Sequence, residues 1–341
     1  MKITDDAEVR PAGGGAPVLP GAENGVHGMM SDARAGGTYA VLFRTHLWDD
    51  FVERQYQRLQ ARVGRGALFI LVDETSGKVP VPHANIVSHS EAGVLALGLS
   101  GAGHGNLLWF NGDYPLYFFY EQHPGYDFYI MTEYDVGVQR PLDGIVDRMA
   151  QDATDLIALP NEDDVGTWPL THTCRDAYAE EEIRKCLICI AAFSNRAVRR
   201  LYDRRLEMSK SEQAGLLRHW PYCEAFIPTE IALAGLGITS LAAFGPVERY
   251  DWSPAVIEAE LPELAGQAFV HPVLDADRFV RHTMKNLWPP EGFFSKRNPV
   301  ARNLRRAPIS VYGPPLARAL FRRVGAPFRG LLSALKPGGG T

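Results

Sequence analysis

The chain has 341 residues, of which 46% are hydrophobic and 22% charged, so it can bury a large core and has an ordinary globular composition. Its formal net charge is −5, but residues 291–341 carry a local excess of Lys and Arg with Glu291 as their one acid, so the rest is strongly acidic. An acidic body excludes a general nucleic-acid binder, which needs a basic folded surface. The sequence shows no secretory signal and no apolar run of about 18 residues, which favours a cytoplasmic protein.

Residues 1–36 are rich in Gly, Pro and Ala without periodicity, and we expect a flexible leader there. The apolar run 38–45 has strand length, and residues 48–64 have apolar side chains at helical spacing up to Gly64. A second apolar run, 67–75, contains Asp73 near its end. These three segments form a predicted β-α-β unit, which implies a parallel, right-handed crossover.

The alternation continues along the chain. Residues 85–97 read as a short strand followed by a helical turn, and the glycine-rich segment 98–105 as a flexible loop. Strand patterns follow at 126–138, 154–160, 186–194, 238–245 and 267–273. Helix patterns lie at 113–125, 141–152 and 223–237, and another helix follows Asn195, which we expect to be its cap. Pro141 stands near the first position of the helix 141–152. Residues 161–181 read as a polar insertion. The expected fold is α/β and doubly wound, with a mostly parallel central sheet and helices on both faces.

The cysteines are Cys174, Cys186, Cys189 and Cys223, too few for a disulfide framework. Cys186 and Cys189 form a C-x-x-C inside the apolar run CLICIAAF, and no second pair completes a four-ligand zinc site. We therefore expect both to lie in a buried strand. No P-loop, no dinucleotide-binding glycine fingerprint and no nucleophile elbow occurs.

Ligands of such folds bind beyond the carboxyl ends of the strands, so acids at strand ends carry the functional information. Glu133 and Asp135 stand two residues apart in TEYDV, and alternation along a strand puts both on one face. Two carboxylates that converge repel each other unless a cation neutralises them. A hard ion such as Mn²⁺ or Mg²⁺ prefers oxygen ligands, and the alternative is a solvated strand end.

The stretch LLWFNGDYPLYFFYEQHPGYDFYIMTEYDV, about residues 107–138, resembles a stretch of a GT-A-fold glycosyltransferase-like family, nucleotide-diphospho-sugar transferases that are poorly characterised. The resemblance implies a GT-A-like doubly wound domain over residues 37–290, which binds the nucleotide sugar and catalyses transfer. It also implies that the acidic motif holds the metal and the donor diphosphate. The family pattern has D-x-D where this chain has E-x-D, so Asp135 is the expected metal ligand and Glu133 a donor-binding residue.

In this fold the end of the first strand, Arg44, Thr45 and His46, faces the nucleotide, and Arg44 can meet phosphate. A local polar cluster is the alternative. Asp73 ends the second strand, where its carboxylate can accept hydrogen bonds from ribose or base or can cap a turn. Asn111 and Asp113 precede the acidic strand as donor-binding candidates, with a helix N-cap as the alternative for Asp113.

His271 ends a short strand, and we expect it to complete the metal ligands by lying close to Asp135; a structural histidine is the alternative. An inverting transfer needs a carboxylate base for the acceptor hydroxyl. Glu224 is the first candidate and Glu230 the second, and each can instead be an ordinary acid at the start of a helix. Trp168 and His172 are candidates for an aromatic platform under the acceptor.

Residues 291–341 form the predicted basic tail, in which 310–336 alternate leucines and other apolar residues with arginines. Such a helix, broken near residues 325–327, can lie on the anionic inner face of the membrane, or it can pack on the body. The resulting hypothesis is a metal-dependent glycosyltransferase of polysaccharide biosynthesis, with a glycan or lipid-linked acceptor. A non-catalytic carbohydrate- or partner-binding protein on the same scaffold is the first alternative. A nucleotidyltransferase is disfavoured, because no glycine follows the first strand.

Overall fold

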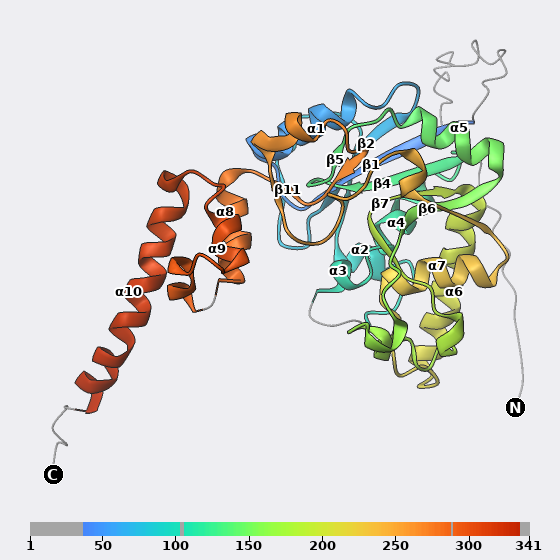
Figure 1. The fold of residues 1–341 in the computed structure, drawn as a ribbon. Helices are drawn as coiled ribbons and strands as arrows, with labels where there is room; N and C mark the ends of the chain where they lie inside the picture. Colours follow the sequence, from blue (N-terminus) through green and yellow to red (C-terminus); the bar gives the residue numbers. More distant parts are fainter. Residues whose placement is uncertain (1–36, 103–105, 288, 335–341) are drawn as a thin grey trace, which may run out of the picture. The chain divides into compact units, whose positions relative to one another are not determined.

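The computed structural model describes residues 37–102, 106–287 and 289–334, the stretch 324–334 by its backbone only. The predicted leader, part of the glycine-rich loop and the last residues of the tail therefore lie outside the described residues. A seven-stranded sheet with the order β3-β2-β1-β4-β7-β6-β8 is the centre of the fold (Figure 1). Its strands are β1 (Tyr39–Thr45), β2 (Ala67–Asp73), β3 (Ile86–His89), β4 (Phe128–Glu133), β6 (Thr154–Pro160), β7 (Cys186–Ser194) and β8 (Gly237–Ser240).

All paired strands of this sheet are parallel except β7, which runs antiparallel to both β4 and β6. The predicted α/β class and the mostly parallel sheet are confirmed. Two small sheets join residues from the middle and the end of the chain: β5 (Gly137–Val138) pairs with β10 (Phe269–Val270), and β9 (Val256–Ile257) pairs with β11 (Val273–Leu274).

Side chains of β1 alternate between two cores, one on each face of the sheet. Val41 and Phe43 pack against α1 (Asp50–Gln60) and α5 (Asp143–Asp152). Ala40 and Leu42 belong to the core on the other face. That face carries α2 (Glu91–Leu95), α3 (Leu107–Phe110), α4 (Tyr114–Gln122), α6 (Asn195–Gln213) and α7 (Cys223–Leu233). The helices therefore cover both faces, as predicted (Figure 1).

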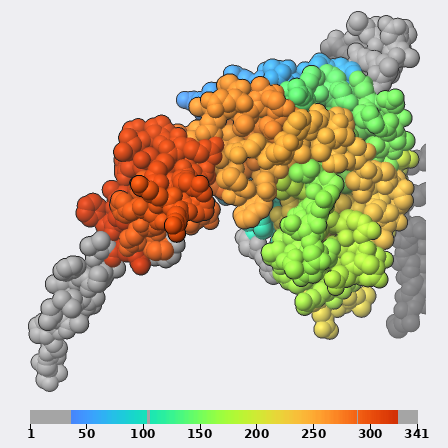
Figure 2. Space-filling view, viewed as in Figure 1, coloured from blue at the N-terminus to red at the C-terminus, as the bar shows by residue number. Residues whose placement is uncertain are grey.

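Several predicted boundaries move because local hydrogen bonds decide them. Ser194, not Asn195, caps α6, since its hydroxyl accepts the amide of Ala197 at 3.2 Å. Pro141 precedes the cap of α5 instead of opening the helix. The insertion 161–181 contains the short 3₁₀ helices η1 (Val165–Thr167), η2 (Thr171–Cys174) and η3 (Glu180–Glu182). The predicted strand 238–245 ends at Ser240 and continues as η4 (Leu241–Phe244). Figure 2 shows the insertion as a compact light-green mass of side chains.

The C-terminal part is helical: η5 (Glu258–Leu264), α8 (Ala276–Lys285), η6 (Pro290–Phe294), α9 (Pro299–Leu304) and α10 (Ile309–Ala334). The predicted end of the main domain, residue 290, falls between residues that share one core: Phe279 and Leu287 before it belong to the same cluster as Leu304 and Leu316 after it. The predicted break near residues 325–327 is wrong, since α10 is continuous there. Within the described residues, no helix has both the length and the apolarity needed to cross a membrane.

Candidate metal centre

Polar residues of four parallel strands collect at one edge of the sheet. Arg44 on β1 pairs in register with Glu133 at the end of β4, and Asp73 on β2 pairs with His89 at the end of β3. Carboxyl ends of parallel strands meet at the same edge, which is where α/β folds bind ligands. The antiparallel β7 begins at this edge, so its first residues also face the ends of the other strands.

Glu133 is the last residue of β4, but Asp135 lies in the turn between β4 and β5. The strand alternation used to put both on one face therefore does not extend to Asp135. Two hydrogen bonds fix the turn instead: the amide of Val136 donates to the carbonyl of Glu133 at 3.2 Å, and the amide of Val273 donates to the carbonyl of Asp135 at 2.7 Å. The second bond ties the acidic motif to the segment that carries His271.

His271 separates β10 from β11, so the predicted strand 267–273 is two short strands around it. Its Nδ1 lies 2.7 Å from the carbonyl oxygen of Asp251. A carbonyl can only accept, so Nδ1 carries the hydrogen, and Nε2 is the ring atom left to serve as a ligand. That atom lies 3.9 Å from a carboxylate oxygen of Glu133 and 3.7 Å from Oδ1 of Asp135. The structure thus brings the three residues together.

The three side chains fit a divalent ion. Oδ1 of Asp135 is buried and has no hydrogen-bond partner among the described residues. Burial raises the pKa of Asp135 to about 6, with His271 opposing and Glu133 adding to the shift. The separations of 3.7 and 3.9 Å exceed a hydrogen bond, yet ligands bound to one ion at about 2.0–2.2 Å lie roughly 3–4.4 Å apart. A cation would remove both the repulsion and the unsatisfied oxygen.

Cys189 is a fourth neighbour, which the sequence analysis placed only in a buried strand. The pairing of Thr132 with Ile190 sets Glu133 opposite Cys189 on the antiparallel β7. Ligand atoms of Glu133, Cys189 and His271 lie within 4.8 Å of one another. Burial, with the charges of Glu133 and Asp135 nearby, raises the pKa of the thiol well above its usual range. Only the strand register, which a single sequence does not give, reveals this neighbour.

Glu224, at the start of α7, is half-buried on the same side of the sheet. Burial and then the charge of Glu133 raise the pKa of Glu224 to about 8. The preceding Tyr222 has its ring 5.2 Å from that of Trp109, which is 59% exposed, and 6.3 Å from that of Trp168. These three rings form an aromatic cluster beside Glu224.

His172 does not join this cluster. It is exposed, and its Nδ1 lies 3.0 Å from the carbonyl oxygen of Pro169.

Glu230, on the same helix, has a different environment. It is 1% exposed and accepts a hydrogen bond from the hydroxyl of Tyr178 at 2.9 Å. Arg204 and Arg200 donate to its two oxygens at 2.9 and 3.2 Å. Both oxygens of Glu230 are thus occupied by donors from the protein itself, an arrangement that holds helices together, so we interpret Glu230 as a structural acid.

Asn111 and Asp113, predicted to bind the donor, are both fully buried in hydrogen bonds within the protein. The side-chain oxygen of Asn111 accepts from the indole of Trp220 at 2.7 Å. Asp113 pairs with the equally buried Arg205 at 2.7 Å and accepts from the hydroxyl of Tyr117 at 2.9 Å. Asp113 occupies the N-cap position of α4, as the alternative expected, but its side chain makes no cap hydrogen bond.

The three polar residues at the end of β1 differ in what they contact: some contact neighbouring residues of the chain and one contacts the candidate metal centre. Nη1 of Arg44 lies 3.8 Å from the carboxylate of Glu133. Thr45 is buried and donates to the carbonyl of Leu47 at 2.6 Å, closing a local turn. His46 is exposed, with its ring 5.6 Å from that of Tyr134. Of this strand end, Arg44 therefore contacts the candidate centre most directly.

The ends of β2 and β3 add one residue that the sequence analysis missed. Asp73 accepts the amide of Thr75 at 2.9 Å, which is the turn role considered for it, and its other oxygen accepts no hydrogen bond from the described residues. His89 is 5% exposed, and its Nδ1 has no hydrogen-bond partner among the described residues. Burial lowers the pKa of His89 to about 4, with Asp73 opposing, so the ring is neutral.

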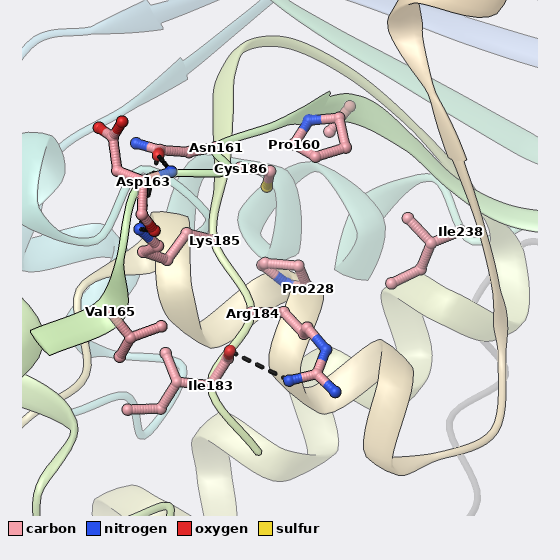
Figure 3. Close-up of a pocket in the computed structure, with 11 residues that line it drawn as sticks. Pro160, Asn161, Asp163, Val165, Ile183, Arg184, Lys185, Cys186, Pro228 and Ile238 are labelled. Atoms are coloured by element: carbon pink, nitrogen blue, oxygen red, sulfur yellow. Dashed lines mark hydrogen bonds between the residues drawn. The ribbon is translucent and has the colours of Figure 1, made fainter. Parts of the chain in front are cut away.

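A cavity of about 240 Å³ lies past the end of β6 and the start of β7, between the insertion and Pro228 of α7 (Figure 3). Its one buried ammonium, that of Lys185, donates to the carbonyl of Asp163 and lies 3.5 Å from Asn161. None of the predicted site residues lines it. The metal candidates are therefore separate from this cavity, although Cys186 in its wall precedes Cys189 on the same strand.

No protein-family model and no curated protein matches the chain. The chain is similar to the solved structure of the galactosyltransferase LgtC in complex with donor and acceptor sugar analogues, with 9% identity, a TM-score of 0.37 and coverage of 78% of this chain and 94% of that one. It is also similar to the bifunctional glycosyltransferase WbbM, with 11% identity, a TM-score of 0.37 and coverage of 80% and 51%. A third is a glycosyltransferase involved in the glycosylation of the major capsid of PBCV-1, with 9% identity, a TM-score of 0.34 and coverage of 69% and 92%. The function proposed below rests on the side chains of this chain.

Proposed function

We propose that the protein is a metal-dependent glycosyltransferase that moves a sugar from a nucleotide-diphosphate donor to a glycan or lipid-linked acceptor. One observation carries the proposal: Glu133, Asp135 and His271 converge at the carboxyl edge of a mostly parallel sheet, and a buried oxygen of Asp135 lacks a partner. Such an edge is where α/β proteins bind nucleotides, and a diphosphate needs positive charge that the three residues alone do not supply.

Asp135 and His271 are the proposed ligands of Mn²⁺ or Mg²⁺, with Glu133 either joining them or binding the donor sugar. A divalent ion held there supplies the positive charge that stabilises the leaving diphosphate. The hydrogen bond from His271 to the carbonyl of Asp251 orients the imidazole, because it fixes which nitrogen faces the acids. Arg44, 3.8 Å from Glu133, adds a second cation for phosphate.

Glu224 is the proposed base that takes the proton of the acceptor hydroxyl. With a pKa raised to about 8, its carboxylate holds a proton more strongly than an ordinary glutamate, which suits a base that works near neutral pH. The aromatic cluster of Trp109, Trp168 and Tyr222 lies on its side of the site and offers ring faces on which sugars stack. For the nucleotide, Asp73 and the neutral His89 offer the polar groups at the neighbouring strand ends.

A second candidate function is a non-catalytic carbohydrate-binding protein on this scaffold. The aromatic cluster supports it independently of any metal, because the exposed Trp109 can stack on a sugar without chemistry. Binding of a nucleotide sugar without its hydrolysis or transfer would favour this candidate. The basic helix α10 carries the exposed residues Arg318 and Arg322. We propose that this helix contacts an anionic membrane and that the protein lies at the inner face of that membrane.

The test is thermal stabilisation of the purified protein by a panel of nucleotide diphosphates, each with and without Mn²⁺. A ligand that binds only the native state raises the apparent stability by mass action. We expect a shift with one nucleotide that requires metal and disappears in Asp135→Ala. Binding of UDP and Mn²⁺ by this variant at the wild-type level would make the assignment of the site wrong.

A further inference from the structure

A cavity of about 470 Å³ with several polar side chains in its wall lies between α8, α9 and the loop at Ser253. It differs from the metal centre in its chemistry: no Asp or Glu lines it, whereas His282, Thr283, Asn286, Arg302, Asn303 and Arg306 do. Both arginines belong to the basic segment 291–341, in which Glu291 is the one acid. The electrostatic potential of the cavity favours an anion.

Two of its wall residues have polar atoms without a partner. Thr283 is 3% exposed, and its hydroxyl oxygen makes no hydrogen bond with the described residues. Nε2 of His282 on the same helix is buried and equally unpartnered. A buried polar atom without a partner destabilises the fold, so two in one wall indicate a ligand or ordered water that satisfies them.

The two arginines play different parts. Arg306 is neutralised by a bidentate ion pair with Glu260, and it also donates to Asn303 at 2.6 Å. Arg302 is exposed, and within the described chain it has no hydrogen bond or ion pair through its side chain. Its guanidinium is therefore available to pair with an oxyanion in a bidentate manner, while Asn286 adds an amide donor to the same cavity.

Short connections tie this cavity to the metal centre. Asp251, whose carbonyl orients His271, precedes Ser253 in the cavity wall by two residues. On the other wall, β11 leads from His271 directly into α8 and thus to His282. Burial lowers the pKa of His282, with Lys285 and His271 adding to the shift.

We propose that this cavity binds an anionic group, a phosphate or a carboxylate, of the sugar acceptor. Arg302 supplies the charge, and the Thr283 hydroxyl and the Asn286 amide donate hydrogen bonds to the oxyanion. That the bound anion belongs to a sugar acceptor rests on the proposed function. Binding of the anion itself does not depend on that function. It predicts that neutral sugars are poor acceptors compared with sugars that carry a negative charge.

The test measures binding to the full chain by titration calorimetry without metal or nucleotide, using inorganic phosphate, glucose 1-phosphate, glucuronate and neutral glucose. We expect at least one anion to bind and glucose not to bind. Phosphate and glucose 1-phosphate binding without glucuronate identifies a phosphate group, and the reverse identifies a carboxylate. Binding of glucose as tightly as of the anions, or of none of them, overturns the proposal.

Variants locate the site. Arg302→Gln should weaken anion binding about tenfold or more, as expected for loss of one charged hydrogen-bonding partner. Arg318→Ala, which removes an exposed arginine outside the cavity, should leave it unchanged. Thr283→Val should weaken binding while leaving the melting temperature of the free protein equal or higher, since it removes an unsatisfied hydroxyl at constant shape. Unchanged anion binding in both cavity variants overturns the assignment, whereas metal-dependent nucleotide binding reports separately on the proposed function.

Discussion

Two acidic regions of this protein look alike in sequence and differ in their surroundings. Asp113 is fully buried, and its carboxylate contacts Arg205 and Tyr117, so its charge is compensated. Asp135 is half-buried, with 16% of its side chain exposed, but its buried Oδ1 has no hydrogen-bond partner among the described residues, and burial raises its pKa to about 6. A compensated acid stabilises the fold, whereas an uncompensated one costs stability and implies a missing cation. The difference separates structural acids from functional acids more sharply than their position near a strand end does.

The largest effect on stability is expected from Asp113→Asn. The change leaves the fully buried Arg205 without its carboxylate, and breaking such a pair costs about 3–5 kcal/mol. Chemical denaturation should show this loss at neutral pH. A double variant, Asp113→Leu with Arg205→Met, should be more stable than the single one, because no charge remains buried alone. If the Asp113→Asn protein is stable but binds nucleotide poorly, Asp113 binds the donor and is not a structural acid.

Asp135→Asn should behave in the opposite way. The substitution removes a charged metal ligand, so metal-dependent nucleotide binding should fall by about 100-fold, the equivalent of roughly 3 kcal/mol. Its melting temperature without metal should be unchanged or higher, because a buried carboxylate that lacks a partner is replaced by a neutral amide. Calorimetry with Mn²⁺ and thermal denaturation measure the two quantities on one preparation. A destabilised variant with normal binding would make Asp135 another structural acid.

Glu224 and Glu230 allow the same comparison within one helix. Glu224 has its folded-state pKa raised from 4.5 to about 8, so the folded protein binds its proton more tightly than the unfolded chain does. The resulting stability is complete below pH 4.5 and is lost as the pH rises toward 8. Glu224→Gln should therefore raise the melting temperature at pH 8, by roughly 2–4 °C for each kcal/mol regained, and change it little at pH 4.5.

The matched control is Glu230→Gln. Its carboxylate pairs with Arg200 and Arg204, so the substitution should lower the melting temperature at neutral pH instead of raising it. If both variants change the melting temperature equally and in the same direction, Glu224 and Glu230 do not differ in the way proposed. A loss of transfer activity in Glu224→Gln, with donor binding retained, would support its role as the base.

The sequence predicted the sheet well, because apolar runs such as 38–45 and 67–75 mark buried parallel strands without tertiary information. It also singled out Glu133, Asp135 and His271 by their chemistry, and the structure brings these three side chains close together. It failed where the decisive partner is far along the chain: Arg205 lies 92 residues from Asp113 and nothing near Asp113 announces it. The alternation rule also failed at Asp135, since β4 ends two residues earlier and a turn sets the direction of its side chain.

The smallest effect concerns Cys189, whose sulfur lies with ligand atoms of Glu133 and His271 inside a 4.8 Å cluster. The antiparallel direction of β7 places it there, and a thiolate favours softer ions over Mg²⁺. Cys189→Ser should therefore weaken binding of Co²⁺ by about tenfold while leaving Mg²⁺ binding nearly unchanged. Absorption spectroscopy provides a second readout, because a sulfur ligand gives Co²⁺ a charge-transfer band in the near ultraviolet that serine does not. A wild-type cobalt complex without this band would show that oxygen and nitrogen alone hold the ion, and Cys189 would then belong with Asp113 and Glu230 among the residues that only build the fold.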